Sequence, residues 1–186
     1  QFRFYELTTI ERRKWAGTGY MYEYQRIMNP VDKREILNDK ILFCKSYSQF
    51  IKRNVFDIND LQSSKQNILK ILGNPTGKIV FKAKSGNCGK QVEIRNTADF
   101  SPDNLVGYMS NHNFDMVEDF IVQHNLLTEL SPNSVNTVRV FTNLTKEDFV
   151  DILGCRLRLG IEKNVDNLAS GGIAVAVDEE TGIVTS

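Results

Sequence analysis

A glycine-bearing loop flanked by lysines is the first feature of the sequence that could do chemistry. Residues 82–90 read Lys-Ala-Lys-Ser-Gly-Asn-Cys-Gly-Lys and lie between two strand-like segments, Lys78 to Ala83 and Gln91 to Arg95. Backbone N–H groups at such a tip, with lysines on either side, can wrap the phosphates of a nucleotide. The spacing fits neither a P-loop (GxxxxGK[ST]) nor a kinase loop (GxGxxG). Taken alone, the loop is interpreted more simply as a solvated hairpin tip.

Three arginines on neighbouring strand-like segments form the second candidate. Residues 151–160 alternate between apolar and polar, which places Arg156 and Arg158 on one face. Arg139 lies on a polar face of the segment Asn136 to Thr142. Converging guanidinium groups match the geometry of a phosphate or a carboxylate, so these residues predict an anion site. The alternative is a solvated sheet face on which the arginines pair with carboxylates, and the pattern alone leaves both open.

Other polar segments have simpler interpretations. The loop Asp166 to Gly172 ends in two glycines that would let backbone approach a ligand, but by itself it is a turn. The acidic stretch Asp178 to Glu180 lies between apolar strands and is typical of a hairpin turn. The histidines, His112 and His124, are not spaced as metal ligands. The three cysteines lack CxxC spacing and support neither a zinc site nor a disulfide framework.

The elements that must position these residues are helices first and strands later, which predicts an α+β fold. Helices are expected over Thr8 to Met28, from Asp39 onward, and over Asp60 to Leu72. The hairpin of residues 78–95 follows. The remaining expected elements are a helix over 101–111, a strand over 116–122, a short helix near 126–130, and strands over 136–142, 151–160, 173–177 and 183–184.

Composition limits the class of protein. The chain has 186 residues with 23 Lys and Arg against 23 Asp and Glu, so its formal charge is zero and a nucleic-acid partner is not expected. No apolar run approaches the ~18 residues of a membrane span. The start at Gln1 has no signal-peptide pattern and indicates a chain cut from a longer one. We expect a cytoplasmic domain.

Taken in order, these features resemble the ATP-grasp superfamily of carboxylate–amine ligases. Asn38 to Lys40 is similar to the "DK" that opens the first ATP-binding subdomain of that family. Residues 79–82 are similar to its "hhhKP" strand, although Ala83 replaces the proline. Residues 85–89 resemble its mobile glycine-rich lid, and residues 117–121 resemble the "hEEhh" hinge strand that holds adenine.

The resemblance continues to the end of the chain. Residues 137–140 resemble the "DhRhh" strand of the ligases that add glutamate to carboxylates, and Asn167 to Gly172 is similar to their "NLxxGG" loop. Residues 123–127 and 134–140 are closest to the branch of sugar-transfer-associated ATP-grasp proteins, which are found beside genes for surface polysaccharide synthesis. The fold that this resemblance implies is N-terminal helices followed by mixed or antiparallel sheet subdomains.

The resemblance implies an enzyme that phosphorylates a carboxylate with ATP, after which a nucleophile displaces phosphate from the acyl phosphate. Lys40 and Lys82 would hold the α- and β-phosphates, and the backbone of Asp119 and Ile121 would read the adenine edge. The implied nucleotide-binding residues are Lys40, Lys82, Ser85, Gly86, Gly89, Glu118, Asp119, Ile121 and Arg156. The implied catalytic residues, which would neutralise the γ-phosphate and the acyl phosphate, are Arg139, Arg158 and Asn167.

The resemblance also implies domains and partners. It divides the chain into an N-terminal helical segment (1–38), a first ATP-grasp subdomain (39–122) and an incomplete second one (123–186). In this superfamily the Mg²⁺ ligands lie on a later strand and loop, as an acidic residue followed by "ExN". No segment after Gly172 matches this pattern. The chain is therefore expected to be a fragment, with its Mg²⁺ ligands beyond Ser186. The expected partners are ATP and a small carboxylate or sugar-linked substrate. The alternatives are a nucleotide-binding pseudoenzyme or sensor, and an interaction domain that binds no nucleotide.

Overall fold

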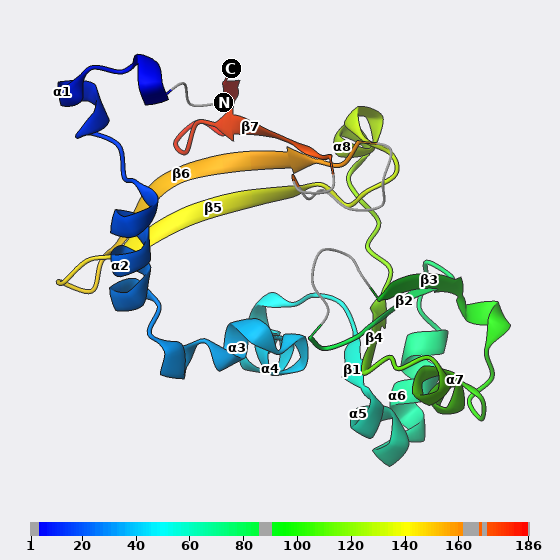
Figure 1. Cartoon of the computed structure of the whole chain (residues 1–186). Helices are drawn as coiled ribbons and strands as arrows, with labels where there is room; N and C mark the ends of the chain where they lie inside the picture. The colour runs from blue at the N-terminus through cyan, green and yellow to red at the C-terminus, as the bar shows by residue number, and fades with distance from the viewer. Residues whose placement is uncertain (1–3, 86–90, 162–167, 169–170, 186) are drawn as a thin grey trace. The chain divides into compact units, whose positions relative to one another are not determined.

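The computed structural model describes residues 4–85, 91–161, 168 and 171–185 (Figure 1). The chain divides into two compact units, residues 1–35 and residues 36–186. None of the described helices is both long and apolar enough to cross a membrane. The second unit combines helices with two antiparallel sheets, so the predicted α+β class is confirmed.

The first unit consists of short helices. They are a 3-10 turn (Phe4–Glu6), α1 (Thr9–Arg12), α2 (Thr18–Met28) and a second 3-10 turn (Val31–Lys33). The single helix predicted over Thr8 to Met28 is wrong, because Gly17 adopts an extended conformation (φ −68°, ψ 168°) and begins α2. Glycine is a poor helix former, and it interrupts the pattern here. None of the described residues of this unit is buried.

The first sheet of the second unit has the strand order β1-β4-β2-β3. Its strands are β1 (Val55–Asp57), β2 (Lys78–Lys82), β3 (Val92–Asn96) and β4 (Met116–Asp119). All pairs are antiparallel, and β2 and β3 form the predicted hairpin. β1 was not predicted, because three residues between two helical patterns carry too little alternation to be recognised. β4 ends at Asp119, three residues before the predicted end.

Three helices cover one face of this sheet (Figure 1). They are α5 (Ile58–Ser63), α6 (Lys65–Leu72) and α7 (Leu105–Asn111). The core between them and the sheet includes Leu61, Ile71, Ile79, Phe81, Leu105, Met109 and Val117, all less than 2% exposed. Each such side chain contributes about 1.5–3 kcal/mol on burial. The helix predicted over Asp60 to Leu72 is two helices, because Ser64 is extended (φ −146°, ψ 108°).

The register sends a second set of side chains to the opposite face. Glu118 lies opposite Val80 of β2 and Val55 of β1, and Met116 lies opposite Lys82. Residues directly opposite each other on antiparallel strands project from the same face. Helices α3 (Glu35–Asn38) and α4 (Lys40–Ser46), with the 3-10 turn Ser48–Phe50, precede β1 in the chain, and α4 contacts β1.

The second sheet has the order β5-β6-β7-β8 and follows α8 (Asn125–Leu130). Its strands are β5 (Thr137–Leu144), β6 (Val150–Leu159), β7 (Ile173–Val177) and β8 (Val184–Thr185). A bulge pairs Phe141 with Gly154 but Thr142 with Ile152, which leaves Leu153 unmatched. The alternation predicted for residues 151–160 therefore holds only from Gly154 onward.

A buried polar cluster fixes the start of this sheet. Asn136, which is 6% exposed, donates from Nδ2 to the carbonyls of Leu127 (3.1 Å) and Ser131 (3.2 Å). Its Oδ1 accepts from the N–H of Gly160 (3.2 Å) and from the Ser134 hydroxyl (3.0 Å). Buried polar groups are stable only when hydrogen-bonded, and this amide ties α8 and the start of β5 to the end of β6.

Candidate functional site

A buried carboxylate lies at the centre of the most strongly charged cluster in the first sheet. Glu118 projects from the face opposite α5, α6 and α7, and its side chain is only 4% exposed. Burying an unpaired carboxylate is very costly, so it needs cationic partners nearby. Two are present, one for each carboxylate oxygen.

The two partners reach Glu118 from neighbouring strands. Lys82, at the end of β2, forms an ion pair with Oε1. Arg53, two residues before β1, donates from Nε (3.2 Å) and Nη2 (3.0 Å) to Oε2. The Lys82 side chain is 25% exposed and that of Arg53 is 31% exposed. The three side chains together carry one net positive charge, which faces solvent through Lys82 and Arg53.

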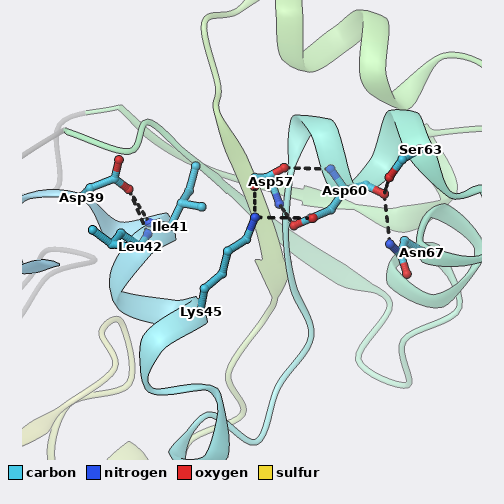
Figure 2. A network of polar contacts seen from close by, with 8 residues as sticks. All are labelled: Asp39, Ile41, Leu42, Lys45, Asp57, Asp60, Ser63 and Asn67. Carbon is cyan, nitrogen blue, oxygen red and sulfur yellow. Dashed lines mark hydrogen bonds and ion pairs between the residues drawn. The ribbon is translucent and has the colours of Figure 1, made fainter.

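A third cation, Lys40, lies at the start of α4. The helix expected from Asp39 onward begins at Lys40, and Asp39 is its N-cap, since its Oδ1 accepts from the N–H groups of Ile41 (2.8 Å) and Leu42 (3.1 Å), as Figure 2 shows. The Nζ of Lys40 donates to the carbonyls of Ala83 (2.9 Å) and Lys84 (3.3 Å). This lysine therefore joins α4 to the chain that leaves β2 toward residues 86–90.

The environment of Lys40 favours loss of its proton. Burial, followed by the positive charge of Lys82, lowers the pKa of Lys40 below that of an ordinary lysine. Asp115, Asp39 and Glu118 oppose this effect without cancelling it. A polyanion bound here would stabilise both ammonium groups, so the site is electrostatically suited to phosphate.

A cavity of about 330 Å³ is lined by these charged side chains together with several apolar ones. We call it the Lys82 cavity; its lining residues are Leu37, Lys40, Phe43, Cys44, Ile51, Arg53, Lys82, Met116 and Glu118. Its volume lies at the lower end of the range for small-molecule sites. Because its lining combines apolar side chains with cations, the cavity suits a ligand that has an apolar part and an anionic part.

A neighbouring network holds α4 in place (Figure 2). Lys45 of α4 reaches the carboxylates of Asp57 (2.5 Å) and Asp60 (3.5 Å). Asp57 also caps α5, since its Oδ1 accepts from the Asp60 N–H (2.8 Å). Burial acts to raise the pKa of Asp57, but the hydrogen bonds from Lys45 and the Asp60 N–H outweigh it, so the pKa is lowered. This network fixes α4 against β1 and α5, and through α4 it positions Lys40.

The last residue of β4, Asp119, and the segment after it contain the residues predicted to bind the adenine edge. Asp119 accepts at Oδ2 from the backbone N–H (2.8 Å) and side-chain Nδ2 (2.7 Å) of Asn54, so its side chain fixes the start of β1. Ile121 lies beyond the end of the strand and is 38% exposed. The Ile121 N–H donates to no acceptor among the described residues, so it can donate to a ligand.

The three predicted arginines share one face of the second sheet. Arg139 lies directly opposite Arg156, and Arg158 is two residues further along β6. In β7, Ala176 and Ala174 lie opposite Arg156 and Arg158, so the neighbouring strand adds only small side chains to this face. We call these three arginines the arginine face. Arg156 donates from Nη1 to its neighbour's carbonyl, that of Cys155 (2.8 Å).

Several predicted residues lie outside the description or have structural roles. Gly86, Gly89 and Asn167 fall outside the described residues. Ser85 is described and exposed at the end of the turn that follows β2. Asp178 accepts from the Thr181 N–H (2.7 Å) and hydroxyl (2.6 Å), as a hairpin turn requires. Within the described ranges, no group of three or more His, Cys, Asp or Glu side chains could hold a metal ion.

Arg53 is the charged residue of this site that sequence reasoning missed. It lies in the stretch Lys52 to Asn54, which has no recognisable pattern and precedes the unpredicted strand β1. Its partner Glu118 is 65 residues away in the chain. The signal that would have found it is burial of Glu118, which only the strand order of the sheet makes evident, since a buried carboxylate needs more cationic charge than one lysine supplies.

Comparison with known protein families gives a match over the second half of the sequence. Residues 102–186 match the family model described as sugar-transfer associated ATP-grasp. No curated protein matches the chain. The predicted resemblance to that branch is confirmed, and the matched region contains β4, α8 and the whole second sheet, including Glu118 and the arginine face.

Proposed function

We propose that the chain binds ATP as part of an ATP-dependent carboxylate ligase, because residues 102–186 match the family model described as sugar-transfer associated ATP-grasp. The observation that carries the proposal is the Lys82 cavity, in which Lys40 and Lys82 lie beside the buried Glu118 of β4. β4 belongs to the matched region, whereas both lysines precede it. The assignment of the lysines therefore rests on their geometry.

The nucleotide part of the proposal uses charge and one backbone donor. Lys40 and Lys82 bind the α- and β-phosphates as point charges, because ammonium groups neutralise phosphate without requiring a fixed orientation. The Ile121 N–H and the Asp119 carbonyl bind the adenine edge. The loop from Ser85 through Gly86 to Gly89 supplies further backbone donors to the phosphates.

The arginine face and Asn167 bind the acceptor side of the reaction. A substrate carboxylate oxygen attacks the γ-phosphorus of ATP, the bond from that phosphorus to the bridging oxygen breaks, and ADP leaves with the bond's electrons. A nucleophile then attacks the acyl carbon and releases inorganic phosphate. Arg139 and Arg158 stabilise negative charge on the transferred phosphoryl group, and Arg156 supports them. We propose a sugar-linked or other small carboxylate as the acceptor, in surface polysaccharide synthesis.

Mg²⁺ accompanies ATP in most phosphoryl-transfer enzymes, where it neutralises the charge that develops on the phosphates. The described residues offer no group of three His, Cys, Asp or Glu side chains that fits such an ion. No step of the proposed reaction is therefore assigned to a metal held by these residues. The lysines and arginines act directly on the nucleotide and the acyl phosphate.

The second candidate function is a nucleotide-binding sensor without chemistry. The Lys82 cavity supports this alternative as well, because a sensor also needs cations that bind the phosphates of ATP. The sensor shares the ATP site with the ligase, but it neither cleaves ATP nor transfers its phosphoryl group after binding. An interaction domain that binds no nucleotide would leave the lysines of the Lys82 cavity without a ligand.

Trapping of an acyl phosphate separates these functions. The full-length protein is incubated with ATP, Mg²⁺, hydroxylamine and a panel of sugar acids and small carboxylates, and ADP and hydroxamate are measured. A ligase forms both products in equal amounts with its own substrate. ATP binding by equilibrium dialysis, without ADP or hydroxamate for any acceptor, indicates the sensor. Absence of ATP binding contradicts both functions.

A further inference from the structure

We propose that Arg53 is a positioning residue that frees Lys82 to bind phosphate. In this proposal Arg53 keeps the charge of Glu118 compensated when Lys82 leaves that carboxylate for the nucleotide. The inference deepens the proposed ATP site and rests on it. The resemblance assigns no role to Arg53, which lies outside the matched region.

The geometry divides Glu118 between its two partners. Arg53 holds Oε2 through two nitrogens, Nε and Nη2, whereas Lys82 holds only Oε1. Either cation can therefore withdraw without disturbing the other's contact. A guanidinium offers its donors in a rigid fork, and the flexible stem of lysine lets its ammonium group change partner. The resident partner is thus Arg53, and the mobile one is Lys82.

The backbone next to Arg53 is fixed firmly enough for this role. Asn54 is bonded to Asp119 by three contacts: Asn54 N and Nδ2 donate to Asp119 Oδ2 (2.8 and 2.7 Å), and Asp119 N donates to the Asn54 carbonyl (3.0 Å). These bonds hold Asn54 against the residue that follows Glu118. The Arg53 side chain is thereby delivered to the buried carboxylate.

Charge accounting explains why one cation is insufficient. Glu118 is 4% exposed, so its carboxylate has almost no access to water. If Lys82 were its sole partner, moving Lys82 to a phosphate would leave a buried carboxylate unpaired, which is strongly unfavourable. Lys82 would then stay with Glu118, and the phosphate would lose its contact. With Arg53 in place, Glu118 keeps one cationic partner when Lys82 moves, so the cost of the move is smaller than for a carboxylate left with none.

The test measures ATP affinity by calorimetry in wild type, Arg53→Gln and Arg53→Lys, with Lys52→Gln as the matched control. Lys52 is the adjacent exposed cation and donates only to the Gln49 carbonyl (3.1 Å). We expect Arg53→Gln to weaken ATP binding about ten- to a hundredfold, as removal of one charge-assisted contact does. Arg53→Lys should restore most of the affinity, and Lys52→Gln should leave it unchanged. Adenosine, which has no phosphate, should bind wild type and Arg53→Gln alike.

A double substitution separates positioning from a structural ion pair. In a Glu118→Gln background the buried carboxylate at position 118 is gone, so adding Arg53→Gln should change ATP affinity less than twofold. This pair also serves if Arg53→Gln alone fails to fold, because the double variant leaves no carboxylate unpaired. If Arg53 had only a structural role, Arg53→Gln would lower the unfolding temperature but leave the ATP affinity of the folded protein unaltered.

The outcomes distinguish the proposal from its premise. Failure of the wild-type chain to bind ATP would contradict the proposed function, and the Arg53 role with it. Wild-type binding of ATP with equal affinity in Arg53→Gln would overturn the Arg53 role alone. The Arg53 role would also be overturned if Arg53→Gln weakened ATP binding as much in the Glu118→Gln background as in wild type.

Discussion

Substitution of Lys82 by methionine should separate its two roles, in nucleotide binding and in stability. Methionine keeps an apolar stem of similar length but removes the charge that pairs with Glu118. Loss of a contact to a charged group costs about 1.5–3 kcal/mol. For ATP this corresponds to about a ten- to hundredfold weaker affinity.

The stability effect has its origin in the same contact. Glu118 keeps Arg53 at Oε2 but loses its partner at Oε1. A loss of about 1.5–3 kcal/mol lowers the unfolding temperature by roughly 3–12 °C in a chain of this size. Adding Glu118→Gln removes the unpaired charge, so Lys82→Met/Glu118→Gln should recover most of that temperature without recovering ATP affinity.

The assay is calorimetric titration with ATP beside thermal unfolding followed by circular dichroism. The control is Lys78→Met, four residues earlier on the same strand, where the ammonium lies 5.4 Å from the ring centre of Phe120. Lys78 does not line the Lys82 cavity. Equal ATP affinities for Lys82→Met and wild type would refute the assignment of Lys82 to the phosphates. Recovery of affinity in the double variant would refute the separation of the two roles.

The same contacts support three further predictions. Because the pKa of Lys40 is lowered by burial and then by Lys82, ATP affinity should fall as the pH rises toward 10.5, the ordinary lysine value. Fluorescence titration across this range should show no such fall for Lys40→Arg, and a parallel fall in both proteins would count against Lys40. Asp57→Asn keeps a cap on α5 but loses the charge that meets Lys45. Since the pKa of Asp57 is lowered, its stabilisation is present above its ordinary value of 3.8 and lost as the pH falls through the lowered value. The difference in urea unfolding between wild type and Asp57→Asn should therefore be constant near neutral pH and shrink below pH 3.8; a difference that persists in acid would contradict this. Asn136→Ala should cost about 2–3 kcal/mol in denaturant unfolding, because it leaves buried groups near Gly160 and Leu127 without partners. A cost below about 1 kcal/mol would mean that water replaces the amide.

Local patterns predicted much of the fold. A helix was expected from Asp39 onward, and it begins at Lys40 with Asp39 as its cap. The hairpin of β2 and β3 and the long strand β6 followed from alternation, which reports a sheet face directly. The shared face of Arg139, Arg156 and Arg158 also followed, since it needs only alternation and the pairing of adjacent strands.

The remaining features depend on contacts between distant residues. The extended Ser64 divides a helix whose sequence pattern is continuous, because α5 and α6 pack separately against the sheet. The bulge beside Gly154 shifts Leu153 to the exposed side, where it is 62% exposed. The pairing of Arg53 with Glu118 spans 65 residues and leaves no local signal. Sequence reasoning found Lys40, Lys82 and Glu118 but not Arg53, which shares Glu118 with Lys82.

The most direct test of an ATP site in the Lys82 cavity is the alkylation rate of Cys44 with and without ATP. Cys44 lines the cavity and is half-buried, and burial raises the pKa of its thiol, so it should react slowly but measurably. Cys155 is buried in the second sheet and serves as an internal reference. Peptide mass spectrometry then follows each thiol separately. We predict that saturating ATP slows Cys44 alkylation by about tenfold or more, with no change at Cys155. An unchanged Cys44 rate at an ATP concentration shown to saturate the protein would place the nucleotide elsewhere and contradict the assignment.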